Sequence, residues 1–191
     1  MTNKNIFPIE VYVGSNFNPN LDKDIIEDLE LSKARENGRS ISNRGGFQSN
    51  GIINGDLNEK LKNLVLKHIS NYLENGKYGI EMLHGWINEN NKGDFNVMHS
   101  HPGTDISAVY YVILPKNEKN FIRFYRPGLD LFLYNEFNHK LKHSSNTTYF
   151  DLEVKENNLI IFPGFLFHEV PINNTDEKRI TVAMNFKCEN A

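Results

Sequence analysis

The spacing of apolar residues divides the chain into a helical N-terminal part and a longer β-rich part. Residues 21–37 carry a sparse apolar stripe on a charged background, and residues 56–75 carry apolar side chains at steps of three and four. Such steps are typical of amphipathic helices. Asp56 is suited to cap the start of the second helix, and Asn75-Gly76 to end it. We therefore expect two helices before residue 78.

From residue 78 onward, short runs rich in β-branched and aromatic residues replace the helical pattern. Gly, Pro and Asn separate these runs at the spacing typical of an all-β sandwich or barrel. The predicted strands are residues 78–88, 106–114, 121–125, 147–154, 158–162, 166–170 and 179–187. Helices followed by strands predict a mainly β fold, a jelly-roll barrel flanked by N-terminal helices.

Length and charge restrict the class of protein. A chain of 191 residues suits a single domain, 1–191, with a helical and loop flank at 1–77 and a β core at 78–187. The net charge of -3 gives no electrostatic reason to bind nucleic acid. No apolar run approaches the roughly 18–20 residues that span a bilayer, and the N-terminus lacks the apolar centre of a signal peptide. We expect a cytoplasmic protein without a membrane partner, and a homodimer as the commonest oligomer.

Histidine and cysteine counts limit the metal chemistry that is available. The chain has seven histidines and one cysteine, Cys188. A lone cysteine excludes an internal disulfide and a zinc site built from several thiolates. Any metal must therefore be held by nitrogen and oxygen ligands.

The strongest local signal is the segment GDFNVMHSHPGTD, residues 93–105. His99 and His101 lie two residues apart, so on a strand both side chains leave the same face and are able to share one ion. Asp105 follows a Pro-Gly turn that would return its carboxylate toward that ion. A pair of hydrogen-bonded or surface histidines explains the spacing equally well.

A third histidine lies in the apolar segment FPGFLFHEV, residues 162–170. A buried imidazole at His168 needs a partner for its ring nitrogens. A metal is one such partner, and a hydrogen bond within the core is the commoner one.

The strand predicted at residues 179–187 has one polar and one apolar face. Arg179 and Thr181 share the first face, where a guanidinium and a hydroxyl suit one carboxylate. An ordinary arginine on an exposed edge is the alternative. The opposite face carries the predicted core residues Ile180, Val182, Met184 and Phe186.

Taken together, His99-Ser-His101, His168 and Arg179-Ile-Thr181 resemble the iron(II)/2-oxoglutarate-dependent oxygenases of the prolyl-hydroxylase-like branch. The resemblance covers about residues 78–187. The segments SNRGGFQS, GWIN, HSHPGTDISAVYYV, FPGFLFHEV and DEKRITVAMNF look similar to uncharacterised bacterial and phage oxygenases of this type. The resemblance implies a double-stranded β-helix, the cupin-like form of the jelly roll.

For the metal, the resemblance implies Fe(II) held by His99, His101 and His168. The wider family has a carboxylate where this chain has His101, so the simplest alignment gives three neutral ligands. Two histidines and a carboxylate form the usual facial triad for oxygen activation. Asp105 is the rival to His101 as a ligand, or an acceptor for an imidazole N–H.

For the cosubstrate, the resemblance implies that 2-oxoglutarate binds the iron and pairs its far carboxylate with Arg179 and Thr181. Tyr111, the second tyrosine of Tyr110-Tyr111, would lie close to it. The implied reaction couples oxidative decarboxylation of 2-oxoglutarate by O2 to oxidation of a C–H bond. The enzyme would be a hydroxylase acting on a small molecule or a peptide.

Substrate recognition would fall to segments at the mouth of the barrel. The candidates are residues 43–49, Trp86, Asn88, Arg123 and Arg126. Core or surface packing explains these residues equally well. The loop at 42–51 reads as a surface loop, and residues 127–145 as a lid or an insertion.

Two other functions fit parts of the pattern. A cupin-type metalloenzyme that does not use 2-oxoglutarate would explain Gly93, His99, His101, Asp105, Gly164 and His168. Such an enzyme would not need Arg179, whereas an enzyme that binds the carboxylate of a cosubstrate would. A non-catalytic barrel that binds a ligand or a protein would have no affinity for iron.

Overall fold

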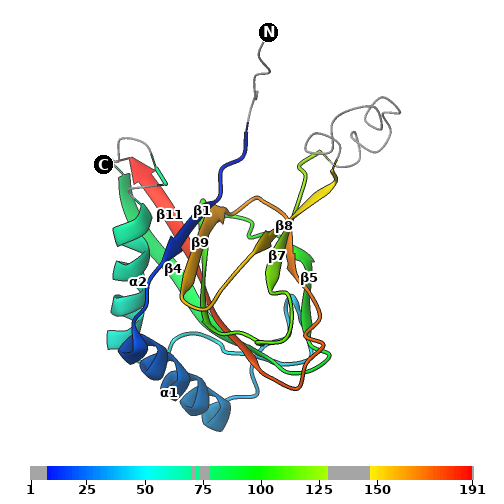
Figure 1. The fold of residues 1–191 in the computed structure, drawn as a ribbon. Helices are drawn as coiled ribbons and strands as arrows, with labels where there is room; N and C mark the ends of the chain where they lie inside the picture. Colours follow the sequence, from blue (N-terminus) through cyan, green and yellow to red (C-terminus); the bar gives the residue numbers. More distant parts are fainter. Residues whose placement is uncertain (1–7, 70–71, 74–77, 129–146, 191) are drawn as a thin grey trace.

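The chain folds into two antiparallel sheets with two helices on one side (Figure 1). The computed structural model describes residues 8–69, 72–73, 78–128 and 147–190. The large sheet has the order β1 (Tyr12–Ser15), β9 (Asn158–Pro163), β6 (Ile106–Ile113), β11 (Arg179–Asn190), β4 (Tyr78–Asn90), β3 (Phe47–Gln48). The small sheet has the order β2 (Asn43–Arg44), β5 (Phe95–His99), β10 (His168–Val170), β7 (Phe121–Tyr125), β8 (Tyr149–Glu153).

Strand β11 organises the large sheet, because it pairs with β4 on one side and β6 on the other. Successive side chains of a strand point to opposite faces. The predicted apolar face is confirmed, since its four residues are at most 3% exposed and pack in one core cluster with the helices. The other face, which begins at Arg179 and Thr181, points into the space between the two sheets. The alternation along β11 therefore separates the core from the candidate site.

Helices α1 (Pro19–Arg35) and α2 (Gly55–Ile69) cover the outer face of the large sheet. Helix α1 begins two residues earlier than predicted, because Asn18 accepts a hydrogen bond from the Leu21 amide. The cap predicted at Asp56 is wrong. The side chain of Asn54 accepts from the amides of Asp56 and Leu57 at 2.9 and 3.3 Å. Neither helix, within the residues that the structure describes, is long and apolar enough to cross a membrane.

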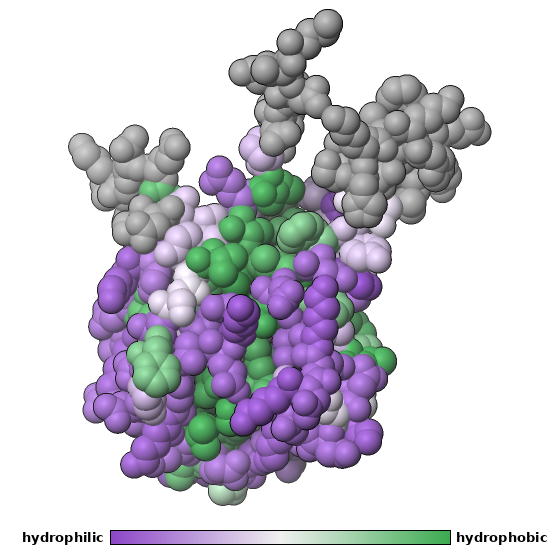
Figure 2. All heavy atoms as spheres, in the orientation of Figure 1, coloured by the Kyte–Doolittle hydropathy of each residue, from purple (hydrophilic) through white to green (hydrophobic). Residues whose placement is uncertain are grey.

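A second core cluster fills the space between the sheets. It is built from Tyr111, Leu114, Ile122, Phe124, Val154, Ile160, Phe162 and Leu166. The rings of Phe124 and Phe162 meet across the sheets with centroids 5.1 Å apart. This second core cluster sets the spacing of the two sheets around the candidate site. On the face of the molecule that Figure 2 shows, apolar residues form a central band bordered by hydrophilic ones.

Two predictions about loops need revision. The segment 42–51, interpreted as a surface loop, contains β2 and β3, which extend the small and the large sheet respectively. The predicted strand at 166–170 is shorter, because only His168–Val170 is extended as β10. Most of the segment 127–145, together with the predicted helix end at Asn75-Gly76, lies outside the described residues.

Candidate active site

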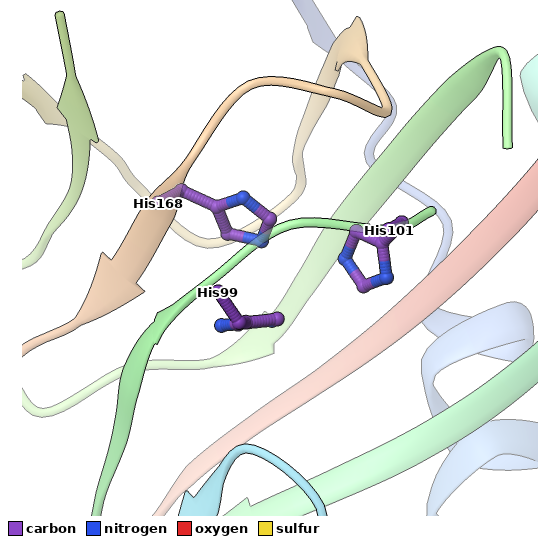
Figure 3. A group of neighbouring side chains, drawn as sticks. All are labelled: His99, His101 and His168. Atoms are coloured by element: carbon purple, nitrogen blue, oxygen red, sulfur yellow. The ribbon is translucent and has the colours of Figure 1, made fainter. Parts of the chain in front are cut away.

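Three histidines meet between the sheets, brought there by strand register and one turn. His99 ends β5 and is directly paired with His168, the first residue of β10. His101 lies beyond the end of β5 rather than on it, and its amide donates to the carbonyl of Gly164 at 2.9 Å. One nitrogen from each ring lies within 4.8 Å of the others. Figure 3 shows the three imidazoles turned toward a common point.

Burial keeps these imidazoles uncharged. It lowers the pKa of His99, and it lowers the pKa of His168 to about 3. Burial together with the neighbouring His99 lowers the pKa of His101 to about 4. At neutral pH each ring therefore has a nitrogen lone pair, which is the form that binds a metal.

Hydrogen bonds to the backbone orient two of the rings. His99 Nδ1 lies 2.7 Å from the carbonyl oxygen of Val97, and His168 Nδ1 lies 2.9 Å from that of Leu166. A carbonyl only accepts, so Nδ1 carries the proton in both rings and Nε2 is left unprotonated. In metal sites, the ring nitrogen that does not bind the metal usually donates a hydrogen bond to a carbonyl or a carboxylate, as Nδ1 does in these two rings. The donor set suits a divalent first-row metal such as iron.

Asp105 is not part of this group. Its carboxylate accepts hydrogen bonds from Lys187 Nζ at 3.0 Å and from the amide of Cys188 at 2.8 Å. Its side chain is 38% exposed, and the three histidines form their group without it. The alternative in which Asp105 replaces His101 as a ligand therefore lacks support, because the Pro-Gly turn directs the carboxylate to the end of β11.

The proposed cosubstrate residues lie together on the interior face of the large sheet. Thr181 on β11 is paired with Tyr111 on β6, and both line the cavity that contains the histidines. Arg179 lies two residues before Thr181 on the same face of β11, is only 2% exposed, and is not among the residues that line the cavity. Burial raises the pKa of the Tyr111 hydroxyl, although the positive charge of Arg179 opposes this shift. Tyr111 is therefore a neutral hydrogen-bond donor close to a buried guanidinium.

Glu118 is a residue that the sequence analysis missed. Its Oε2 atom lies 3.9 Å from Arg179 Nη2, is buried, and has no hydrogen-bond partner within the described part of the chain. Its Oε1 atom accepts from the side chain of Asn174 at 2.8 Å. Arg179 also donates to the carbonyl of Pro171 at 2.8 Å. The loop between β6 and β7 carries Glu118, and no local motif marks it, so only the folded chain brings this pair together.

The predicted substrate residues divide into two groups. Trp86 and Asn88 line the cavity, and the Trp86 ring lies 5.8 Å from the ring of His101. Arg123 is instead bound by Asp151 through Nε and Nη2, at 2.6 and 2.9 Å. Arg126 donates through Nε to the carbonyl of Thr147 at 2.9 Å.

The loop at 42–51 contributes its first residue to the cavity. Ser42 lines it together with Asn96, whose amide donates to the Ser42 hydroxyl at 3.0 Å. Residues 43–49, which were the predicted segment, are not among the residues that line this cavity. The complete cavity wall consists of Ser42, Trp86, Asn88, Asn96, His99, His101, Val109, Tyr111, Ile122, His168, Val170, Thr181 and Ala183.

Three uncharged histidines whose nitrogen atoms converge between two antiparallel sheets suit a non-haem metal site. The sequence specifies the family further. Residues 84–185 match the family described as "Putative 2OG-Fe(II) oxygenase", and the chain belongs to this family. No curated protein matches the chain in sequence.

Several solved structures share the fold at low sequence identity. HygX from Streptomyces hygroscopicus, with nickel and 2-oxoglutarate bound, has a TM-score of 0.65 at 10% identity, covering 93% of this chain and 82% of its own. A prolyl-4-hydroxylase from Pseudomonas putida has a TM-score of 0.61 at 15% identity, covering 94% and 92%. A prolyl hydroxylase from Trichoplax adhaerens, in complex with a peptide fragment, has a TM-score of 0.61 at 16% identity, covering 92% and 82%. The expected double-stranded β-helix is thereby confirmed.

Proposed function

We propose that the protein is an Fe(II)- and 2-oxoglutarate-dependent oxygenase in which His99, His101 and His168 hold the iron. The observation that carries this assignment is the convergence of three uncharged imidazoles in a buried cavity. All three ligands are neutral, so the loaded site keeps the full charge of the metal. A dianionic cosubstrate is therefore attracted to it more strongly than to a site with a carboxylate ligand.

The far carboxylate of 2-oxoglutarate would pair with Arg179, Thr181 and Tyr111. The guanidinium supplies a fixed positive charge, and the two hydroxyls supply hydrogen-bond donors. Their burial excludes water, which strengthens each of these interactions. The bound iron would supply the activation of O2, and the chain would hold the cosubstrate and keep the site dry.

For the substrate, we propose contacts with Trp86 and Asn88. The Oδ1 atom of Asn88 is buried in the cavity wall without a hydrogen-bond partner among the described residues. A buried acceptor of this kind is costly unless a ligand donates to it. This favours a small molecule or peptide that places a hydroxyl or an N–H group at Asn88. A nucleic acid is disfavoured, since the net charge is -3. A cytoplasmic location and a homodimer stay predictions.

The test is anaerobic loading with Fe(II) and 2-oxoglutarate, followed by exposure to O2. We expect a weak charge-transfer band on loading and slow formation of succinate without added substrate. His168→Ala should remove the band. Arg179→Ala should weaken 2-oxoglutarate binding by roughly 10- to 100-fold, because it removes charge-assisted hydrogen bonds.

The matched control is Arg123→Ala, which removes a guanidinium already bound by Asp151. It should leave 2-oxoglutarate binding unchanged. Iron binding without any effect of 2-oxoglutarate would indicate a cupin-type metalloenzyme instead. A protein with no affinity for iron would indicate a non-catalytic barrel.

A further inference from the structure

His101 differs from the other two histidines in what its Nδ1 atom contacts. It faces the side-chain amide nitrogen of Asn185 on β11, at 3.3 Å, instead of a backbone carbonyl. Asn185 is in turn paired with Ser107 on β6, and the Ser107 hydroxyl donates to Asn185 Oδ1 at 2.9 Å. Both side chains are buried, at 6% and 2% exposure. His101, Asn185 and Ser107 therefore form one hydrogen-bonded row, the His101 relay.

The direction in which hydrogen bonds are donated along the His101 relay decides which nitrogen of His101 carries the proton. An amide nitrogen only donates, so the Nδ1 atom that faces it must accept. In a neutral imidazole the proton then resides on Nε2, which has no lone pair left for a metal. His99 and His168 have the opposite tautomer, since their Nδ1 atoms donate to carbonyls.

A half-turn of the Asn185 amide reverses the row. It brings Oδ1 to His101, where it accepts from a protonated Nδ1, and turns Nδ2 to Ser107, where it donates to the hydroxyl. Serine is suited to both arrangements, because a hydroxyl has one donor and two acceptor sites. No proton is gained or lost overall, and Asn185 keeps a hydrogen bond to His101 and one to Ser107 in either direction.

We propose that Asn185 and Ser107 are positioning residues that set the tautomer of His101, and with it whether Nε2 is able to bind the metal. This rests on the proposed function in taking His101 as a ligand. In the metal-bound state the row runs from His101 to Asn185 to Ser107. The opposite direction, in which Asn185 Nδ2 faces His101 Nδ1, leaves Nε2 protonated and unable to bind the metal. An asparagine thus takes the place of the carbonyl that orients each of the other two rings.

The direct test is nitrogen NMR of the full chain with 15N-labelled histidine, above pH 7, with and without Zn²⁺ as a diamagnetic probe. We expect the Nε2–H tautomer at His101 without metal and the Nδ1–H tautomer with it. His99 and His168 should have Nδ1–H in the absence of Zn²⁺. An unchanged Nδ1–H tautomer at His101 in both states would overturn the proposal.

Variants of Asn185 separate the tautomer from general stability. Asn185→Asp supplies only acceptors, so His101 should show Nδ1–H without metal and Zn²⁺ affinity should be at least that of the natural chain. Asn185→Leu supplies neither group and should lower Zn²⁺ affinity by roughly 10- to 100-fold. Equal affinity in Asn185→Leu and the natural chain, with both folded by circular dichroism, would contradict the proposal.

A double-mutant cycle excludes a direct effect of the new carboxylate on the metal. In a His101→Ala background, Asn185→Asp should leave Zn²⁺ affinity unchanged, because the relay no longer has its histidine. A gain in that background would mean that the carboxylate itself binds the metal, which would refute the inference. Should the natural chain bind neither Zn²⁺ nor Fe(II), the proposed function fails. The tautomer of His101 in Asn185→Asp then still tests the relay.

Discussion

His168 and His99 are directly paired across two neighbouring strands, and their ring centroids lie 4.3 Å apart. Two of the three proposed ligands are therefore placed by strand register, which a packed sheet holds more rigidly than a loop does. His101 is placed differently, by a turn bonded to Gly164 and by the His101 relay. We therefore expect substitutions at the strand-paired histidines, His99 and His168, to have different effects from substitutions around His101.

Loss of His168 should abolish tight metal binding. His168→Ala removes one of the three proposed ligands and leaves His99 without its paired partner. We expect Fe(II) or Co²⁺ affinity to fall by at least about 100-fold, measured by competition with a chelator. The control is His68→Ala, which removes a histidine of α2 that contacts the Tyr12 hydroxyl and does not line the cavity. Equal losses in both variants would show that the effect does not come from the site.

The metal-free protein should become less stable as the pH falls below 6.5. The pKa of His168 is lowered by burial from 6.5 to about 3, so below 6.5 the unfolded chain takes up a proton that the folded chain does not. By linkage, this destabilises the folded state progressively as the pH falls toward 3. At pH 5 the contribution of His168 alone is about 2 kcal/mol.

This pH dependence is measured by urea unfolding of chelator-treated protein at pH 5 and pH 7.5. His168→Gln should reduce the difference between the two pH values, because glutamine does not titrate. A metal-free protein with the same unfolding free energy at both pH values would contradict the burial of an uncharged histidine.

The periodicity of β11 explains how much of the fold was predictable. Alternation alone placed Ile180 and Val182 in the core and Arg179 and Thr181 on the opposite face, because one face of the sheet is covered by helices. The same rule separates Tyr110, whose hydroxyl bonds Asp22, from Tyr111 in the cavity. Helix ends were less predictable, since Asn54 and Asp56 are both acceptable caps and the local sequence does not choose between them.

Strand patterns alone explain only part of what the sequence predicted about the site. Strand patterns point to His99, His168 and Thr181, whereas His101 lies in the turn after β5 and not on a strand. The same turn takes the Asp105 carboxylate, the rival ligand, to the amide of Cys188. Glu118 was beyond prediction, because its link to the site is a contact with Arg179, 61 positions away in sequence. Contacts of this kind depend on loop closure and leave no pattern in the residues themselves.

Glu118→Gln should increase the affinity for 2-oxoglutarate. The carboxylate lies 3.9 Å from the Arg179 guanidinium and partly cancels its charge. Its removal leaves more positive potential for an anionic cosubstrate, while the hydrogen bond from Arg179 to Pro171 remains. We expect the Kd for 2-oxoglutarate, measured anaerobically by calorimetry, to fall about 3- to 10-fold. A weaker affinity would mean that Glu118 is needed to hold Arg179 in place.

Gly164→Ala should disturb the turn that supports both His101 and His168. A Cβ atom at this position would lie 2.4 Å from the backbone oxygen of Thr104, which has little freedom to move. We expect a loss of roughly 1–3 kcal/mol in unfolding free energy. Metal affinity should fall as well, because Gly164 accepts a hydrogen bond from the His101 amide. Gly55→Ala is the control, since a Cβ there meets nothing within 4 Å; it should cost neither stability nor metal affinity.

Arg123→Ala should affect stability and spare the uncoupled reaction. The guanidinium binds Asp151 through two nitrogens, reaches Glu169 at 3.3 Å, and lies 4.0 Å from the centre of the Tyr149 ring. These contacts connect β7 to β8 and β10, so their loss should lower the unfolding free energy by about 1 kcal/mol. The measurement is urea unfolding together with succinate formation. A drop in succinate formation at unchanged stability would instead assign Arg123 to the active site, as the sequence alone allowed.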